Sequence, residues 1–272
     1  MNVPFVFGAT SYVIEAGLLE NLLWLSRPDM TLPIGEMQLV LFETPEISNI
    51  PSHKEVSDLA SAAQARGMAF TVHLPGSIAL GSPERAIRAA SVELFKRTVG
   101  VTQALKPICW TLHAPLPSGE DASIYIARAE DALAPLLSEF DSPRELAIEN
   151  VQPVFGAEGQ IIEDLDTSVA IDIGHLICSG QDVWGFIEHW AGRCLNMHIH
   201  GCHDGRDHES LAFLPEGFMA ELLHRVSQIP ALRTVTMEVF GVPDFESSSR
   251  AVAQSLGSTH DMPDMRARAG GA

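Results

Sequence analysis

The chain has 272 residues, 46% of them hydrophobic, and 17 Lys and Arg against 35 Asp and Glu give a formal net charge of −18. This charge argues against nucleic acid as a partner, because binding to a phosphate backbone depends on Lys and Arg that displace counterions. No apolar run approaches the ~20 residues that a membrane span needs, so we expect a soluble protein that acts on a small molecule and binds no membrane.

The first part of the chain alternates short apolar runs with amphipathic segments, which predicts strands followed by helices. Strands are predicted over residues 4–10, 37–43 and 68–72, and a first helix over residues 18–25. Ser52 and Glu55 have the spacing of a capping box, and Gly67 is a stop signal, so they bound the second helix. Ser82 followed by Pro83 predicts the start of the third helix, with Ser at the cap.

The same alternation continues to the end of the chain. Strands are predicted over residues 108–112, 146–148, 169–171, 194–199 and 234–237. A helix is predicted over residues 123–140 and is expected to be interrupted at Pro135, which lacks the N–H that its turn requires. The last helix is predicted over residues 244–256. Periodicity is then lost, so residues 257–272 are expected to form a disordered tail.

Eight strand–helix units in series predict an α/β protein with a closed parallel (β/α)8 barrel, a TIM barrel, in one domain over residues 1–256. The active site of such a barrel lies at the carboxyl ends of the strands. Side chains of the types that bind metal end most of these strands: Glu43, His73, His113, Glu149, Asp172 with His175, His198 and Glu238. A single strand-end residue can solvate or cap the strand, but a full set of these types favours a metal site.

Residues 196–211 hold the densest group of candidate ligands. Four histidines lie there beside two aspartates: His198, His200, His203, His208, Asp204 and Asp207. Imidazole and carboxylate bind zinc, manganese or iron, and a strand can point His198 and His200 the same way. The alternative is a polar loop whose histidines cap helices and satisfy backbone groups.

The four cysteines show no Cys-x-x-Cys pair: they are Cys109, Cys178, Cys194 and Cys202. There is also no cleavable signal segment, so we expect reduced thiols in a cytoplasmic protein. Cys202 lies in the polar stretch, but a free cysteine is more often a small buried hydrophobe than a ligand or a nucleophile.

Imidazoles and carboxylates that converge at a barrel mouth suit two reaction classes. With two or three divalent metal ions the site would clamp a phosphodiester and deliver hydroxide. With one ion, Glu149 and Glu238 would face each other across a sugar and exchange protons at adjacent carbons. A barrel that binds ligands but has lost its chemistry is a third alternative. No Gly-x-Ser-x-Gly elbow or Gly-rich nucleotide loop supports other chemistry.

The strand-end motifs resemble those of a known superfamily. His-x-Pro twice, then Ile-Glu-Asn, Asp-x-Gly-His, His-x-His and Met-Glu-Val-Phe follow in the order of the xylose-isomerase-like barrels, which include the apurinic-site endonucleases. Within that superfamily, residues 8–12, 39–43, 71–75, 172–175 and 204–208 resemble segments of the cobamide-remodelling phosphodiesterases. This resemblance implies hydrolysis of the phosphodiester in the nucleotide loop of a cobamide. The sugar isomerases and epimerases of the superfamily are the alternative.

The resemblance also implies roles for individual residues. The implied metal ligands are His73, His113, Glu149, Asp172, His175, His198, His208 and Glu238. We also expect Glu149 and Glu238 to be catalytic, and the site to hold one to three divalent ions. The nucleases place an aspartate two residues before the last loop histidine, where this chain has Arg206, so Asp207 or Asp204 must replace it. We take Asp207 as that ligand. Arg206 and Glu43 are expected to bind substrate, although Arg206 could equally form a surface ion pair. The oligomeric state stays open.

Overall fold

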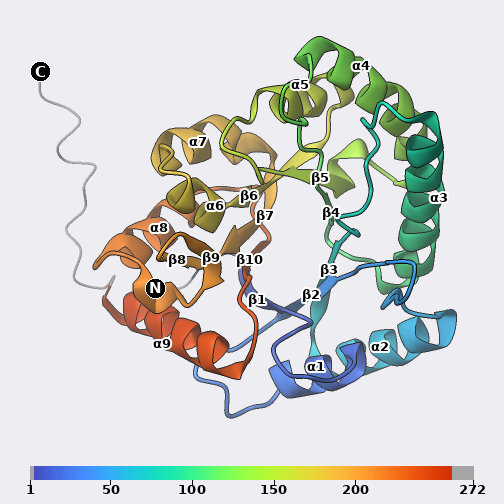
Figure 1. Cartoon of the computed structure of the whole chain (residues 1–272). Coiled ribbons are helices and arrows are strands. Elements are labelled where there is room, and N and C mark those ends of the chain that lie inside the picture. Colours follow the sequence, from blue (N-terminus) through green and yellow to red (C-terminus); the bar gives the residue numbers. More distant parts are fainter. Residues whose placement is uncertain (1–2, 259–272) are drawn as a thin grey trace, which may run out of the picture.

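The protein is described by a computed structural model that covers residues 3–258. Eight parallel strands close into a barrel in the order β1-β10-β7-β6-β5-β4-β3-β2, with the helices around its outside (Figure 1). The barrel strands are β1 Val6–Thr10, β2 Glu36–Val40, β3 Ala69–His73, β4 Trp110–Leu112, β5 Leu146–Glu149, β6 Ser168–Asp172, β7 Cys194–Ile199 and β10 Thr234–Met237. The predicted single-domain (β/α)8 barrel is confirmed.

Helices follow the strands and bury their apolar faces against the barrel. They are α1 Leu18–Leu25, α2 His53–Arg66, α3 Arg85–Thr102, α4 Ala122–Leu133, α5 Gly156–Leu165, α6 Ile173–Cys178, α7 Val183–Trp190, α8 Phe218–Val226 and α9 Val242–Ser258. The boundaries of α2 agree with the prediction. Ser52 and Glu55 form both halves of the capping box, and Gly67 ends the helix in the left-handed conformation.

Two other helix predictions had different outcomes. The predicted cap at Ser82 is wrong, because α3 begins at Arg85 with Glu84 as its N-cap. The Ser82 hydroxyl instead accepts a hydrogen bond from the Glu84 N–H, in a turn that precedes the helix. The interruption predicted at Pro135 is confirmed, since α4 gives way to a 3-10 helix over Ala134–Glu139.

A short antiparallel hairpin, β8 Gly201–His203 and β9 Arg206–Glu209, lies over the carboxyl end of β7 and was not predicted. The expectation of four reduced thiols is wrong for two of them. Cys178, the last residue of α6, forms a disulfide with Cys202 of the hairpin, with their Cα atoms 5.5 Å apart. The packing of α6 against the hairpin brings the two cysteines together. They are 24 residues apart in the sequence, so the pairing could not be predicted from their spacing. Cys109 and Cys194 are free and buried.

The interior of the barrel below the strand ends is partly polar. Buried polar side chains from four strands meet there: Glu36, Gln38, Thr71, Asn196 and Thr236. The hydroxyls of Thr71 and Thr236 donate to the Glu36 carboxylate at 2.6 and 2.8 Å. Burial raises the pKa of Glu36 to about 7, although these hydroxyls lower it. A hydrogen-bonded polar layer therefore supports the residues at the barrel mouth from below.

Within residues 3–258, no helix combines the length and the apolar character needed to cross a membrane. The last helix, α9, ends at Ser258, two residues beyond its predicted end. Residues 259–272, which make up most of the predicted tail, lie outside the described residues.

Candidate metal centre

The buried part of the site is a four-ligand group at the carboxyl ends of strands β5, β6, β7 and β10, made by Glu149, Asp172, His198 and Glu238. One ligand atom from each lies within 4.8 Å of the others. The Nδ1 atom of His198 lies 2.8 Å from Glu149 Oε1, 2.9 Å from Glu238 Oε2 and 3.9 Å from Asp172 Oδ2. Strands on both sides of β7 thus direct carboxylates toward one imidazole.

A two-histidine group lies beside it and shares Glu149. The Nε2 atoms of His73 and His113 lie 3.1 and 2.9 Å from Glu149 Oε2, and 3.0 Å from each other. The other carboxylate oxygen, Oε1, faces His198. The two oxygens of Glu149 are therefore divided between two ligand groups, which is the arrangement of a carboxylate that bridges two metal positions.

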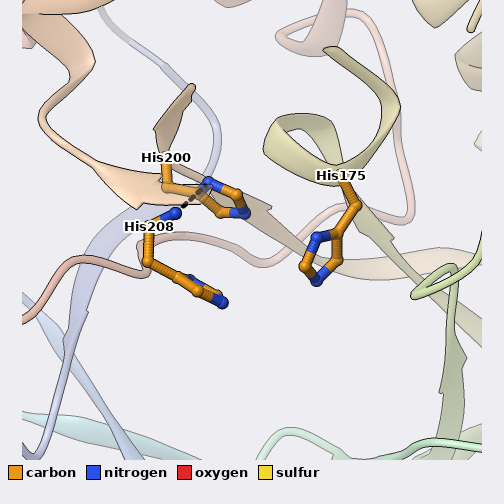
Figure 2. A group of neighbouring side chains, drawn as sticks. All are labelled: His175, His200 and His208. Carbon is orange, nitrogen blue, oxygen red and sulfur yellow. Dashed lines mark hydrogen bonds between the residues drawn. The ribbon is translucent and has the colours of Figure 1, made fainter. Parts of the chain in front are cut away.

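A three-histidine group, His175, His200 and His208, completes the mouth. Figure 2 shows the rings of His200 and His208 side by side, with the His175 ring reaching toward them from α6. The backbone nitrogen of His208 lies 2.9 Å from His200 Nδ1, and His200 Nε2 lies 3.0 Å from Asp172 Oδ1. Asp207 Oδ2 lies 3.7 Å from His175 Nδ1 and 3.9 Å from His208 Nε2.

Local sequence explains how these three histidines meet. Asp172 caps α6 by accepting the His175 N–H at 2.7 Å, so the helix starts directly at the end of β6. Gly174 gives room for the His200 ring, because a Cβ atom there would lie 2.1 Å from it. Asp204 and Gly205, with φ of 52 and 74 degrees, turn the hairpin and bring His208 back over the strand ends.

Charge and hydrogen bonding fit a bound cation. Asp172 Oδ2 and Glu238 Oε2 are buried without a hydrogen-bond partner among the described residues, although Glu238 Oε2 lies only 2.9 Å from His198 Nδ1. Glu149 Oε1 lies at a similar distance, 2.8 Å, from the same nitrogen. Buried carboxylates are normally paired or bound to metal. Three of them in one group, with two oxygens free of hydrogen bonds, make a suitable donor set for a divalent ion.

The pKa values show what balances this charge in the protein alone. Burial lowers the pKa of His198, but Glu149 and Glu238 outweigh burial and hold it well above its usual value. Burial raises the pKa of Glu238, yet His198 brings it down to about 2. Burial likewise opposes ionisation of Glu149, whose pKa is nevertheless held well below its usual value, chiefly by His198 and His113. The three carboxylates of this group thus favour a positive charge at its centre, where a metal ion would also bind.

Of the predicted site residues, nine lie in or beside these groups: His73, His113, Glu149, Asp172, His175, His198, Asp207, His208 and Glu238. Two lie apart from them. Glu43 pairs with Arg97 of α3, and the exposed Arg206 pairs with Glu209 at 3.1 Å, so their roles in binding substrate stay predictions. Asp204 is exposed and lies 3.5 Å from His203.

Three polar residues that contact the ligands were not among the predicted site residues. Asn150 accepts the Asp172 N–H at 2.7 Å and donates to the Asp172 carbonyl. Gln38 and Asn196 lie 2.7 and 2.9 Å from His198 Nε2. Their only sequence signal is a polar residue at an inward position of a strand, which a solvated strand would also show.

The profile of the xylose isomerase-like TIM barrel family matches residues 35–258. The chain belongs to this family. Several solved structures of similar fold, all at low sequence identity, are sugar epimerases or are named as epimerase-like. A D-tagatose 3-epimerase-like protein has a TM-score of 0.72 at 16% identity, over 94% of this chain and 99% of that one. An L-ribulose 3-epimerase has a TM-score of 0.72 at 15% identity, over 98% and 100%.

A 3-keto-D-glucoside 4-epimerase from E. coli has a TM-score of 0.68 at 11% identity, over 95% of this chain and 100% of that one. No curated protein matches the sequence. These comparisons confirm the predicted superfamily and fold. They do not show the cobamide-remodelling subtype, and at this level of identity they do not assign a reaction to the chain.

Proposed function

We propose that the chain is a metal-dependent phosphodiesterase. The observation that carries this proposal is the division of Glu149 between the two-histidine and four-ligand groups, with the three-histidine group beside them. Two or three divalent ions held there would polarise a phosphoryl oxygen and supply hydroxide near neutral pH. Zinc, manganese and iron all suit histidine with carboxylate. Chemistry at a single ion would need only the four-ligand group, so the other two groups favour a reaction that uses more than one ion.

The burial of the ligands indicates the side from which a substrate approaches. Glu149, Asp172 and His198 are almost fully buried and form the floor of the centre. The side chains of His113 and His208 are 30% and 27% exposed and border the mouth. A phosphodiester that enters between them would meet the two-histidine group on one side and the three-histidine group on the other. Arg206, on the same hairpin as His208, is the candidate for binding a phosphate oxygen.

For the substrate we propose a cobamide, cut at the phosphodiester of its nucleotide loop. The support is the resemblance of residues 8–12, 39–43, 71–75, 172–175 and 204–208 to the cobamide-remodelling enzymes. The net charge of −18 makes DNA or RNA a poor partner. A large, amide-rich molecule can instead bind through apolar and hydrogen-bonding contacts without a basic patch.

A second candidate is epimerisation or isomerisation of a keto sugar. Glu149 and Glu238 contact the same nitrogen of His198 from two sides, as a pair of proton-transfer groups around one ion would. The solved structures of similar fold favour this candidate over phosphodiester hydrolysis, because those described above are sugar epimerases or resemble one. Similar folds host different reactions, so we rank it below the reaction that uses all three ligand groups.

One experiment separates the two candidates. The purified chain, loaded with manganese or zinc, is incubated with an intact cobamide and, separately, with ketohexoses, and the products are separated by chromatography. We expect release of a nucleoside and a corrinoid that keeps the phosphate, at a rate that Glu149→Gln reduces strongly. Unchanged cobamide together with interconverted ketohexoses would replace our proposal by the second candidate.

A further inference from the structure

His198 has two ring nitrogens that face different surroundings. Nδ1 faces the carboxylates of the four-ligand group. Nε2 faces the polar interior of the barrel, where the side-chain amide nitrogen of Gln38 lies 2.7 Å away and that of Asn196 lies 2.9 Å away. All three side chains are fully buried. Water therefore cannot replace whichever hydrogen bond Nε2 makes.

A metal ion at the four-ligand group determines which nitrogen carries hydrogen. An imidazole binds metal through a lone pair, so Nδ1 must be free of hydrogen and Nε2 must carry it. The Nε2–H then needs an acceptor, but both neighbouring amides present a nitrogen to it. One of the two amides must turn to offer its oxygen, since the orientation of an amide is fixed only by its hydrogen-bond partners.

The partners of the two amides show which of them turns. The Asn196 oxygen accepts hydrogen bonds from the hydroxyls of Thr234 at 2.8 Å and Thr236 at 3.2 Å. The Gln38 oxygen is buried and has no hydrogen-bond partner in the part of the chain that the structure describes. Turning Gln38 breaks no hydrogen bond of its oxygen, whereas turning Asn196 reverses two.

We propose that Gln38 is a positioning residue for the metal centre: its side-chain oxygen accepts the Nε2–H of His198 and thereby presents the Nδ1 lone pair to the ion. Gln38 lies on β2 and His198 on β7, strands that are not neighbours in the barrel, so the contact crosses the interior. The inference rests on the metal centre of the proposed function, but it holds for either candidate reaction.

Zinc affinity in the absence of substrate tests this role. Gln38→Met keeps the length of the side chain and removes the acceptor, and loss of such a partner weakens metal binding about 10–100-fold. Gln38→Glu keeps an acceptor, so we expect zinc affinity close to that of the wild type. Thr111→Val is the matched control, because its buried hydroxyl makes no hydrogen bond to a metal ligand within residues 3–258 and its removal should leave zinc affinity unchanged.

Competition with a chromophoric chelator gives the affinities, and circular dichroism shows whether each variant folds. Wild-type affinity in Gln38→Met, or an equal loss in Gln38→Glu and Gln38→Met, would overturn the proposal. If Gln38→Met does not fold, nitrogen-15 NMR of the zinc-bound wild type decides. We expect His198 with a slowly exchanging hydrogen on Nε2, and a hydrogen-free Nε2 would refute the inference. Neither measurement uses a substrate, so failure of the proposed reaction leaves this test intact.

Discussion

Substitution of Glu149 by glutamine should disable two ligand groups at once. The carboxylate is 1% exposed and lies 2.8 Å from His198, 2.9 Å from His113 and 3.1 Å from His73. Glutamine keeps the shape but removes the charge and turns one oxygen into a donor. We therefore expect Glu149→Gln to bind at least one equivalent of zinc fewer than the wild type does. Elemental analysis after dialysis measures this difference.

The magnitude follows from the burial of this carboxylate. Removing one partner of a buried ion pair costs about 3–5 kcal/mol. A tenfold change in rate corresponds to ~1.36 kcal/mol, so loss of this interaction in the transition state lowers turnover about 10²–10⁴-fold. The free energy of unfolding of the metal-free protein should fall by a similar amount, because His198 loses its nearest carboxylate.

Glu158→Gln is the matched control for Glu149→Gln. Glu158 on α5 is fully buried and belongs to none of the three ligand groups. Burial raises the pKa of Glu158, so glutamine resembles its protonated form. We expect normal metal content and turnover in this control. Full metal content and near-normal turnover in Glu149→Gln would refute its assignment as a shared ligand.

Three further outcomes are expected. Chelation should lower the melting temperature, and zinc added back at about 100 times its Kd should restore about 2.7 kcal/mol of stability. A melting temperature that changes with neither treatment would argue against a metal site in the folded protein. In the chelated protein, burial lowers the pKa of His200 but Asp172 raises it to about 9. The contribution of His200 to the free energy of unfolding is therefore complete below pH 6.5 and is lost as the pH rises through 9. Urea unfolding at pH 6 and 9.5 measures this loss, and His200→Asn is the control. Reduction of the Cys178–Cys202 disulfide should cost about 3 kcal/mol, given the loop that it closes; Cys178→Ser should melt identically with and without reductant.

Sequence patterns located most strand ends well, and that was enough to place most of the ligands. The second strand is an exception, because β2 ends at Val40 and not at the predicted Glu43. A residue that ends or directly follows a strand of a closed parallel barrel lies at the mouth of the barrel, so His73, His113 and Glu149 had to meet there. Glu238 follows β10 and His198 lies near the end of β7 for the same reason. The prediction needed only the element order, not any side-chain detail.

Features that depend on contacts between distant segments could not be predicted in this way. The hairpin that carries His208 has no apolar alternation, so its strands gave no signal. The disulfide depends on how α6 packs against that hairpin. Gln38 is a single polar residue in an apolar run, and the residue that it contacts, His198, is 160 residues away in the sequence. The position of Arg206 beside Glu209 followed neither from a motif nor from periodicity.

The pairing of β1 with β10 has a consequence for folding. Val6 of the first strand aligns with Thr234 of the last, so the barrel cannot close until almost the whole chain is available. Contacts over such a sequence separation form late, because loop-closure entropy must be overcome first. Glu238 comes directly after β10, which makes the four-ligand group one of the last structures to assemble. High-affinity zinc binding during refolding would therefore report the moment of barrel closure, well after the helices have formed.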